Sequence, residues 1–247
     1  MKAVLLNSGM GTRLDEYTKK LPKCLIPVGD RETILSRQVK VLLDHGITDI
    51  VITTGHLEDK IRYYLRERFP AFDFVFVHNS LYDRTNYIYS LLLAEDELDD
   101  DIVLLHGDLV FAPSVLQKLL SIDEENGVVV NAEANLPEKD FKAEIRSGRV
   151  RKIATGIFSP DCYFLLPMYR FSLASMRQWV DEMKLFQQQG YLQSYAETAL
   201  NNILERLELY PVYISDELCM EIDNLEDLQK VSNLLRKASS EGEDHVD

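Results

Sequence analysis

A glycine loop near the start of the chain, followed by two basic residues, could hold a negatively charged ligand. Residues 3–6 form an apolar run that predicts a buried strand, and Gly9 and Gly11 follow it. Glycines let the backbone approach a ligand closely, and amide N–H groups of such a loop can bind an anion beside Arg13 and Lys23. The third glycine of a dinucleotide-binding motif and the Gly-Lys-Ser/Thr of a Walker motif are both missing. Taken alone, the spacing fits either an anion cradle or a plain tight turn.

Asp108 follows an apolar run, residues 102–105, and could hold a divalent cation. Ligands of a parallel sheet bind at the carboxyl ends of its strands, and a carboxylate at such an end suits Mg²⁺. His106 lies two residues earlier, but Mg²⁺ prefers oxygen ligands, so we interpret His106 as a packed or hydrogen-bonded residue. A structural role for Asp108, capping the turn after the strand, is the alternative.

Residues 85–94 begin with Thr85 and Asn86 and continue as an apolar stretch, which predicts a helix with Thr85 as its N-cap. Asn86 is then either an ordinary residue of the first turn or a contact for the base of a nucleotide. An asparagine amide both donates and accepts hydrogen bonds, as recognition of a pyrimidine edge requires.

Alternating strands and helices position these residues in the first half of the chain. Apolar runs predict strands at 49–54 and 72–77, and helical periodicity predicts helices at 32–45 and 57–69. This alternation implies parallel strands with helices on both faces, so we predict an α/β, Rossmann-like, three-layer fold with a mostly parallel central sheet. Three polar stretches fall at the predicted carboxyl ends of strands: Asn7-Ser8-Gly9, Thr53-Thr54-Gly55 and His78-Asn79.

After residue 131 the alternation becomes less regular. The remaining predicted elements are a hairpin turning at 147–148, a strand at 161–169 interrupted by Pro167, helices at 172–189 and 195–206, a last pair of strands at 209–214 and 218–222, and a helix at 225–237. The sequence shows neither an internal repeat nor a linker, so residues 1–238 are predicted to form a single domain. Residues 239–247 are small, polar and acidic, which predicts a disordered tail.

Composition limits the possible partners and the compartment. The net charge of −14 disfavours nucleic acid and anionic membranes as partners, so an anionic substrate would depend on local clusters of basic residues. The three cysteines are widely separated and form no Cys-x-x-Cys motif, which predicts reduced thiols in the cytoplasm. The N-terminal apolar run is too short for a signal peptide, and no stretch approaches the length of a membrane span. We therefore expect a cytoplasmic protein without a membrane or nucleic-acid partner.

The glycine loop and the lysine segment together carry a family resemblance. Gly9-x-Gly11-Thr12-Arg13, followed after a spacer by Pro22-Lys23-x-Leu25-x-Pro27-Val28, resembles the signature of nucleotidyltransferases that join a nucleotide to a small phosphorylated metabolite. The stretch Asn79-x-x-Tyr82-x-x-x-Asn86-x-Ile88-Tyr89-Ser90 resembles the bacterial choline-phosphate cytidylyltransferases and the related phosphonate cytidylyltransferases. The sequence departs from the wider pattern at Asn7-Ser8, where most sugar nucleotidyltransferases carry two alanines.

This resemblance implies the nucleotidyltransferase fold and assigns roles to individual residues. The glycine loop and Arg13 would hold the triphosphate, and Lys23 would neutralise charge where the phosphates of the two substrates meet. Asp223 would be the second ligand of a Mg²⁺ ion on Asp108, supported by Glu221, with a helix cap as the alternative role for Asp223. The implied nucleotide-binding residues are Asn7, Ser8, Gly9, Met10, Gly11, Thr12, Arg13, Thr54, Gly55, Asn79, Thr85, Asn86, Ser90 and His106.

In this family the acceptor binds to a portion that corresponds to about residues 135–210. The implied acceptor-binding residues are Lys23, Tyr163, Tyr195 and Glu197. Aromatic rings could face an ammonium group of the acceptor, although such rings are also common in a protein core. Glu197 and Asn201 share one helix face, so they either lie on the surface or reach an amine of the acceptor.

These features predict a cytidylyltransferase that transfers CMP from CTP to a small phosphate or phosphonate, phosphocholine or 2-aminoethylphosphonate, and releases pyrophosphate. Mg²⁺ is the expected cofactor, and a monomer or homodimer is the expected assembly. The alternative is a sugar-1-phosphate nucleotidyltransferase that uses UTP or dTTP, which residues 85–87 and the short second half disfavour. The presence of both Asp108 and Asp223 disfavours a non-catalytic nucleotide sensor, and the lack of Asp-x-Asp at 106–108 disfavours a glycosyltransferase.

Overall fold

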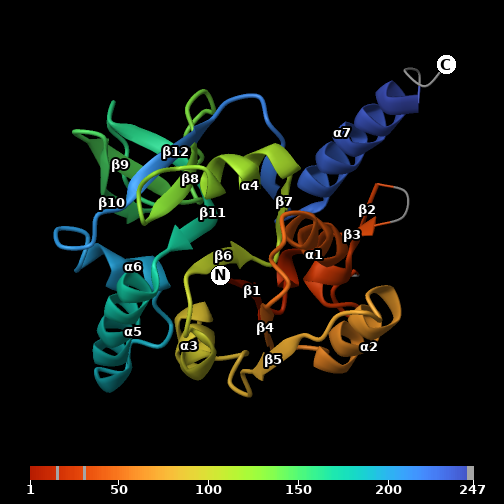
Figure 1. Ribbon diagram of the computed structural model, residues 1–247, viewed down its shortest axis with the longest axis horizontal. Coiled ribbons are helices and arrows are strands. Elements are labelled where there is room, and N and C mark those ends of the chain that lie inside the picture. The colour runs from red at the N-terminus through yellow and green to blue at the C-terminus, as the bar shows by residue number, and fades with distance from the viewer. Residues whose placement is uncertain (15–16, 30–31, 244–247) are drawn as a thin grey trace.

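The computed structural model describes residues 1–243 except 15–16 and 30–31, with side chains up to residue 238. Its centre is a nine-stranded sheet, shown in Figure 1. The strands of this sheet are β1 (Lys2–Asn7), β4 (Ile50–Thr54), β5 (Val75–His78), β6 (Ile102–His106), β8 (Gly127–Asn131), β9 (Lys142–Arg146), β10 (Arg149–Ala154), β11 (Cys162–Phe171) and β12 (Tyr210–Ile214).

The core of the sheet is parallel. Strands β6, β1, β4 and β5 lie side by side in this order, and each pair of neighbours is parallel. Beyond β6 the sheet becomes mixed, because β11 pairs antiparallel with β6, β8 and β9. The parallel core confirms the predicted Rossmann-like arrangement and places the carboxyl ends of β1, β4 and β6 at one edge, where such folds bind ligands.

Helices cover both faces of the sheet and give the predicted three layers. Along β1, Val4 and Leu6 belong to the apolar cluster of one face, and Ala3 and Leu5 belong to that of the other. The first face is covered by α3 (Tyr87–Leu93), α5 (Leu173–Gln188) and α6 (Ala196–Asn201), and the second by α1 (Ile34–Asp44), α2 (Glu58–Arg68) and α4 (Pro113–Leu120). In the part of the chain that the structure describes, no helix is both long enough and apolar enough to cross a membrane.

Two short antiparallel ribbons lie outside the main sheet: β2 (Pro27–Val28) with β3 (Glu32–Thr33), and β7 (Leu109–Phe111) with β13 (Cys219–Glu221). Helix α7 (Leu225–Glu243) then returns to the N-terminal half of the molecule, beside β2 and β3 in Figure 1. There Leu228 and Val231 pack in one apolar cluster with Ile26 and Val28. The short 3₁₀ turns are η1 (Thr12–Leu14), η2 (Lys23–Leu25) and η3 (Glu95–Glu97).

Some predicted boundaries are wrong. The last two strands do not pair with each other, because β12 joins β8 in the main sheet whereas β13 joins β7. The helix predicted at 195–206 ends at Asn201, since the chain turns at 202–206 on its way to β12. The strand predicted at 72–77 begins only at Val75. Helix α7 continues to Glu243, past the predicted start of the tail, and residues 244–247 lie outside the described part of the chain.

The hairpin and the proline-containing strand of the second half are confirmed. Strands β9 and β10 pair around Ser147 and Gly148, which have φ values of +52° and +73°. Strand β11 continues through Pro167, but its pairing with β8 shifts register between Leu166 and Tyr169. A proline cannot donate a backbone hydrogen bond, so it is tolerated where the ladder is irregular.

Candidate active site

The glycine loop turns back over Lys23 at the carboxyl end of β1. Gly11 has a φ of +64°, a left-handed conformation that glycine adopts without strain. A Cβ atom added at Gly11 would lie 2.9 Å from Cβ of Lys23, so the close approach also requires glycine. The loop and Lys23 can therefore share one wall of a cavity.

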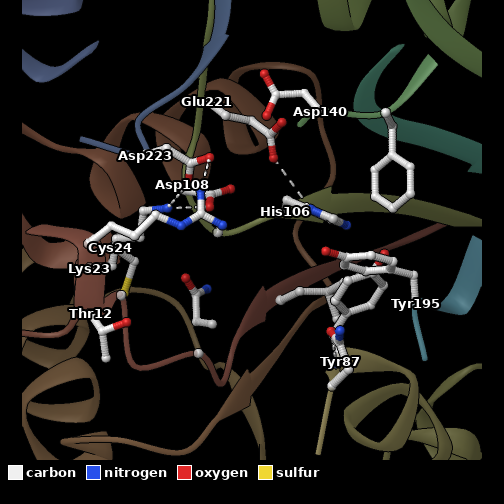
Figure 2. A pocket seen from close by; sticks show the side chains of 18 of the residues that line it. Thr12, Lys23, Cys24, Tyr87, His106, Asp108, Asp140, Tyr195, Glu221 and Asp223 are labelled. Atoms are coloured by element: carbon white, nitrogen blue, oxygen red, sulfur yellow. Dashed lines mark hydrogen bonds and ion pairs between the residues drawn. The ribbon is translucent and has the colours of Figure 1, made fainter. Parts of the chain in front are cut away.

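Lys23 lies between two carboxylates from distant parts of the chain. Its Nζ donates to Oδ2 of Asp108 at 2.6 Å and to Oδ1 of Asp223 at 2.9 Å, as Figure 2 shows. Nη1 of Arg13 donates to Oδ2 of Asp223 at 2.7 Å. These four residues are the ones that the sequence predicts as catalytic, and the structure brings them together.

The β7–β13 ribbon brings the two carboxylates into contact with Lys23. In this ribbon Glu221 lies opposite Leu109, one residue after Asp108. The backbone N–H of Ile222 donates to the carbonyl oxygen of Asp108 at 3.0 Å and extends the pairing by one more step. Residue 223 consequently follows the ribbon at the same end as Asp108.

The alternative role of Asp223, a helix cap, is not what the structure shows. Oδ1 of Asn224 accepts hydrogen bonds from the backbone N–H groups of Glu226 at 2.8 Å and Asp227 at 3.0 Å, at the start of α7. The carboxylate of Asp223 is instead held by Lys23 and Arg13. Asn224 therefore caps the helix and leaves Asp223 at the cavity.

A group of three side chains beside this ion pair could hold a metal ion. One ligand atom from each of His106, Asp108 and Glu221 lies within 4.8 Å of the others. Oδ1 of Asp108 is buried and has no hydrogen-bond partner among the described residues. Carboxylate oxygens are ligands that Mg²⁺ accepts, so the residues present fit a divalent cation. The cluster thus contains Glu221, the predicted support, and His106, which is not predicted as a ligand. Asp223, the predicted second ligand, is not one of its three members and contacts Lys23 and Arg13 instead.

Burial and neighbouring charges shift the pKa values of these groups. Burial would lower the pKa of Lys23, but the charges of Asp108 and Asp223 outweigh this effect and raise it. Burial opposes the ionisation of Asp108, yet Lys23 and His106 together lower its pKa. Burial and the charge of Asp108 raise the pKa of Glu221 to about 7, against the opposing effect of His106. At neutral pH Lys23 and Asp108 are therefore charged, while Glu221 is partly protonated.

These residues line a main cavity of about 380 Å³, which shares part of its lining with a side cavity of about 180 Å³. We call the two together the cleft. Predicted residues that line the main cavity are Asn7, Gly9, Gly11, Thr12, Arg13, Lys23, Asn86, His106, Asp108, Tyr195, Glu221 and Asp223. Further predicted residues at the side cavity are Ser8, Asn79, Thr85 and Ser90.

A chain of hydrogen bonds fixes the polar side chains of the side cavity. Oγ of Ser8 donates to Oγ1 of Thr53 at 3.0 Å and accepts from Oγ of Ser90 at 2.9 Å. Nδ2 of Asn79 donates to Oγ of Ser90 and to Oγ1 of Thr85, both at 3.0 Å. Because these groups bind one another, they form a fixed polar surface at the end of strands β1, β4 and β5.

Asn86, and not Thr85, caps helix α3. Oδ1 of Asn86 accepts from the backbone N–H of Tyr87 at 2.8 Å, and its Nδ2 donates to the carbonyl oxygen of Gln193 at 3.4 Å. The hydroxyl of Thr85 donates to the carbonyl oxygen of Leu81 at 2.8 Å, so it stabilises the turn before the helix and does not cap the helix. Asn86 lines both cavities. Its contact with a nucleotide base stays a prediction.

Asn7 has an unusual environment at the main cavity. It is 6% exposed, and neither amide atom has a hydrogen-bond partner among the described residues. Gly107 packs so closely that a Cβ atom added there would lie 2.0 Å from Oδ1 of Asn7. A buried amide without a partner costs free energy, so the side chain of Asn7 does not contribute to stability through hydrogen bonds.

Three residues predicted to bind the nucleotide, Met10, Thr54 and Gly55, lie outside the lining of both cavities. Met10 is exposed, whereas Thr54 is fully buried at the end of β4. At Gly55 an added Cβ would lie 2.6 Å from Cβ of Tyr82, which lines the side cavity. Gly55 therefore acts indirectly, because the absence of a side chain leaves room for Tyr82.

Glu197, predicted to bind the acceptor, is buried behind the cleft and does not line it. It is 1% exposed, and its carboxylate accepts hydrogen bonds from the hydroxyls of Tyr87 and of Tyr169, the latter at 2.9 Å. Its Oε1 also lies 4.0 Å from Nε2 of His106. Glu197 is therefore neither a surface residue nor an acceptor contact, the two roles that the sequence suggests. It instead holds Tyr87, which lines the cavity, by a hydrogen bond.

Tyr163 and Asn201 also lie elsewhere. The ring of Tyr163 packs edge-to-face against Tyr213, with 5.5 Å between ring centres, and does not line either cavity. The side chain of Asn201 accepts from the backbone N–H of Ile153 at 2.8 Å and donates to its carbonyl oxygen at 2.7 Å. Asn201 therefore joins α6 to β10.

Four residues of the second half line the main cavity although no sequence pattern predicts them there: Lys139, Asp140, Phe141 and Thr155. Residues 139–141 lie between β8 and β9 in a segment without helical or strand periodicity. The available signal was the cluster of two charged residues and one aromatic residue at the start of the expected acceptor-binding portion. Tyr87 and Cys24 were missed as well, since each looks like a core residue in sequence.

Comparison with known proteins places this site in a family. A family model described as MobA-like NTP transferase domain matches residues 3–243. The "Bifunctional IPC transferase and DIPP synthase" of Archaeoglobus fulgidus is 28% identical over 248 residues, which cover 98% of this chain and 45% of that protein. This chain thus spans less than half the length of the archaeal relative. The choline-phosphate cytidylyltransferase of Streptococcus pneumoniae is 25% identical over 243 residues, which cover 96% of this chain and 99% of that protein.

A solved structure has the same fold. The CTP:phosphocholine cytidylyltransferase from Streptococcus pneumoniae superposes with a TM-score of 0.77 at 21% sequence identity, covering 95% of this chain and 98% of that chain. The family match covers almost the whole chain, including every strand and helix that forms the cleft. The chain therefore belongs to the MobA-like NTP transferase domain family and is a nucleotidyltransferase.

Proposed function

We propose that the protein transfers CMP from CTP to a small phosphate or phosphonate and releases pyrophosphate. An oxygen of the acceptor attacks the α-phosphorus of CTP, so that a new P–O bond forms while the bond to the β-phosphate oxygen breaks. Phosphocholine and 2-aminoethylphosphonate are the proposed acceptors. Their ionised oxygens are already nucleophiles, so the reaction requires no covalent intermediate on the protein.

The position of Lys23 between Asp108 and Asp223, in a cavity lined by the glycine loop, is the observation that supports this proposal most strongly. Nucleotidyl transfer brings two anions together, and their repulsion grows as they approach. An ammonium group that moves from the carboxylates to the phosphates neutralises this charge at the reacting centre. Arg13 and the amide N–H groups of the loop would hold the β- and γ-phosphates that leave.

Asp108 and Glu221, with Asp223 beside them, are the residues that would hold Mg²⁺. When bound, this ion would neutralise charge on the phosphate oxygens and make the α-phosphorus more electrophilic. The protein contributes the orientation of the three carboxylates, which the β7–β13 ribbon fixes. Asp108 and Asp223 also hold Lys23 in the free protein, and its ammonium, which has three N–H donors, would turn toward the phosphates when the substrates bind.

An aromatic and acidic wall supports an acceptor with a positively charged end. The rings of Phe141 and Tyr195 pack edge-to-face with 4.9 Å between their centres, and the ring centre of Tyr87 lies 6.2 Å from that of Tyr195. Asp140 lines the same cavity. Both aromatic rings and carboxylates attract ammonium groups. The name of the streptococcal relative, a choline-phosphate cytidylyltransferase, points to the same class of acceptor.

A matrix of substrates tests the proposal. CTP, UTP, dTTP, ATP and GTP are each combined with phosphocholine, 2-aminoethylphosphonate, inositol 1-phosphate and glucose 1-phosphate, and pyrophosphate release is measured. We expect the highest kcat/KM for CTP with phosphocholine or 2-aminoethylphosphonate. A higher kcat/KM for UTP or dTTP with glucose 1-phosphate would instead identify a sugar-1-phosphate nucleotidyltransferase.

A further inference from the structure

Lys142, the first residue of β9, is a fully buried lysine whose ammonium binds main-chain oxygens of a single loop. Its Nζ donates to the carbonyl oxygens of Pro137, of Glu138 at 3.3 Å and of Asp140 at 3.0 Å. The ammonium also lies 4.4 Å from the ring centre of Phe158. An ammonium group has three N–H donors, so this loop can satisfy all of them.

This arrangement fixes the backbone of the 137–141 loop. Burial of an ammonium group is costly unless hydrogen bonds replace its hydration. The oxygens that do so here all belong to the five residues before Lys142, so a shift of the loop would leave a buried charge unsatisfied. The backbone N–H of Leu165 donates to the carbonyl oxygen of Phe141 at 3.0 Å and attaches the end of the loop to β11.

The fixed loop presents its side chains to the main cavity. Lys139, Asp140 and Phe141 all line it, and Figure 2 shows Asp140 beside Glu221 on the side of the cavity away from Lys23. Burial and the nearby charge of Asp223 raise the pKa of Asp140, although Lys142 and Arg13 oppose this. A cationic group placed beside Asp140 would favour the ionised carboxylate and would be attracted by it.

We propose that Lys142 is a positioning residue for acceptor binding: by fixing the 137–141 loop, it holds Asp140 and Phe141 against the positively charged end of the acceptor. The inference rests on the proposed function for the existence of an acceptor, and it adds which group of the acceptor is recognised and by which residues. Asp140 supplies the opposite charge, and Phe141 supplies an aromatic surface beside it. Lys142 itself contacts no substrate.

The test compares Lys142→Met and Asp140→Asn with Arg170→Met as a matched control. Methionine retains much of the apolar volume of lysine but has no donor, and asparagine retains the shape of aspartate without its charge. Nη1 of Arg170 donates to the carbonyl oxygens of Leu120 at 3.3 Å and Ile122 at 3.1 Å. Arg170→Met therefore also leaves main-chain carbonyl oxygens without their donor, but these oxygens lie outside the lining of the cleft.

The KM of CTP and of each acceptor is measured with phosphocholine, 2-aminoethylphosphonate and inositol 1-phosphate, which carries no positive charge. An inhibition constant replaces the KM for an acceptor that is not turned over. We expect Lys142→Met and Asp140→Asn each to raise the KM of the two cationic acceptors about tenfold, equivalent to about 1.4 kcal/mol. The KM of CTP should change less than twofold, as should the value for inositol 1-phosphate in Asp140→Asn.

The double variant Lys142→Met/Asp140→Asn should bind the acceptor no more weakly than Lys142→Met alone, because both changes act through the carboxylate of Asp140. Arg170→Met should lower the melting temperature without changing any acceptor KM. Additive effects in the double variant, or an equal rise in the KM of CTP, would overturn the inference. If Lys142→Met does not fold, Lys142→Gln replaces it, because glutamine retains two N–H donors. In either case, an unchanged acceptor KM in Asp140→Asn overturns the inference.

Failure of the proposed function gives a different result. Wild-type protein would then release no pyrophosphate from CTP with either cationic acceptor. In that case calorimetry of phosphocholine and 2-aminoethylphosphonate with the same variants decides the inference. Weaker binding by Asp140→Asn and Lys142→Met supports it, whereas no binding by the wild type, or equal binding by Asp140→Asn, overturns it.

Discussion

The two walls of the cleft satisfy their buried polar groups in opposite ways. On the wall formed by the glycine loop and the end of β6, the amide of Asn7, Oδ1 of Asp108 and Nε2 of His106 are buried without hydrogen-bond partners among the described residues. On the wall formed by the 137–141 loop, the ammonium of Lys142 binds three carbonyl oxygens of the protein itself.

This difference indicates a division of tasks between the walls. Unpaired groups at the first wall lower the stability of the free protein, but they are ready to bind a charged ligand. The satisfied ammonium at the second wall stabilises a loop and gives it a fixed shape. The first wall is therefore suited to the reaction and the second to recognition of the acceptor.

Asp108→Asn should have the largest effect, because Asp108 supplies the counter-charge of Lys23 and is one of the side chains proposed to hold Mg²⁺. We expect turnover to fall more than a hundredfold, equivalent to about 2.7 kcal/mol, since an amide is not an anionic ligand. Pyrophosphate release at saturating CTP measures the loss, and circular dichroism checks the fold. A variant that keeps more than a tenth of wild-type turnover in excess Mg²⁺ would remove Asp108 from the reaction.

Lys23→Ala should have the next largest effect. Its ammonium neutralises charge that increases as the two substrates approach, so kcat should fall at least tenfold while the affinity for CTP falls much less. Rate measurements give kcat, and calorimetry gives the Kd of CTP. If both quantities change by the same factor, Lys23 only anchors the bound nucleotide and the first wall is not specialised for the reaction.

Asn86→Ala tests the junction of the two cavities. Wild-type kcat/KM should be at least tenfold higher for CTP than for UTP, about 1.4 kcal/mol, because the wrong base leaves buried polar groups unpaired. The variant should show a smaller ratio. Use of UTP within about threefold of CTP by the wild type would contradict the cytidylyltransferase proposal. An unchanged ratio in the variant alone would limit Asn86 to its role as the cap of α3.

Asn7→Ala should sharpen the contrast in stability. The amide of Asn7 has no described partner, so its removal should raise the free energy of unfolding by about 1 kcal/mol. Asn126 is the matched control, because it is equally buried but donates to Glu208 at 3.0 Å and accepts from Ser172 at 3.1 Å. Asn126→Ala should lower the same free energy by about 1–3 kcal/mol. Urea unfolding compares the two, and an equal loss in both would contradict the assignment of Asn7 as an unpaired group.

Tyr163→Ala should have the smallest effect on the reaction. Tyr163 packs against Tyr213 outside the cleft, so the KM of the acceptor should change less than twofold. Steady-state kinetics with phosphocholine measures this value beside that of Tyr195→Ala, which removes a ring from the cavity. A larger effect at Tyr163 than at Tyr195 would show that the second wall extends beyond the residues that line the cavity.

Sequence patterns were informative where the chemistry follows strand ends. Parallel strands must deliver their carboxyl ends to one edge, so Asn7, His106 and Asp108 could be placed together from an apolar run followed by a polar residue. The partner of Asp108 could not be derived in this way. Asp223 reaches it through the short β7–β13 ribbon, whose pairing across more than a hundred residues has no local signal.

For two buried charged residues, residue type alone was misleading. Glu197 has the charge expected of an acceptor contact, but tertiary packing buries it against the hydroxyls of Tyr87 and Tyr169. Lys142 has the charge expected of a surface residue, yet it is fully buried because a loop supplies its hydrogen bonds. The orientation of such residues depends on contacts between distant segments, which neither helical nor strand periodicity encodes.

Strand β11 connects the two walls, and Pro167 separates the part that pairs with β6 from the part that pairs with β9. Met168–Phe171 pair with β6 of the parallel core, whereas Cys162–Phe164 pair with β9, which begins with Lys142. Strands β9 and β10 consequently form an edge of the sheet whose ladder pairing with the rest of it runs through β11, while Asn201 and the backbone N–H of Val150 attach β10 to α6 and to Leu209. Under the proposed function, substitutions in this edge would alter acceptor binding while the pairing of β1 with β4 and β6 stays unchanged, so one transferase core could serve different acceptors.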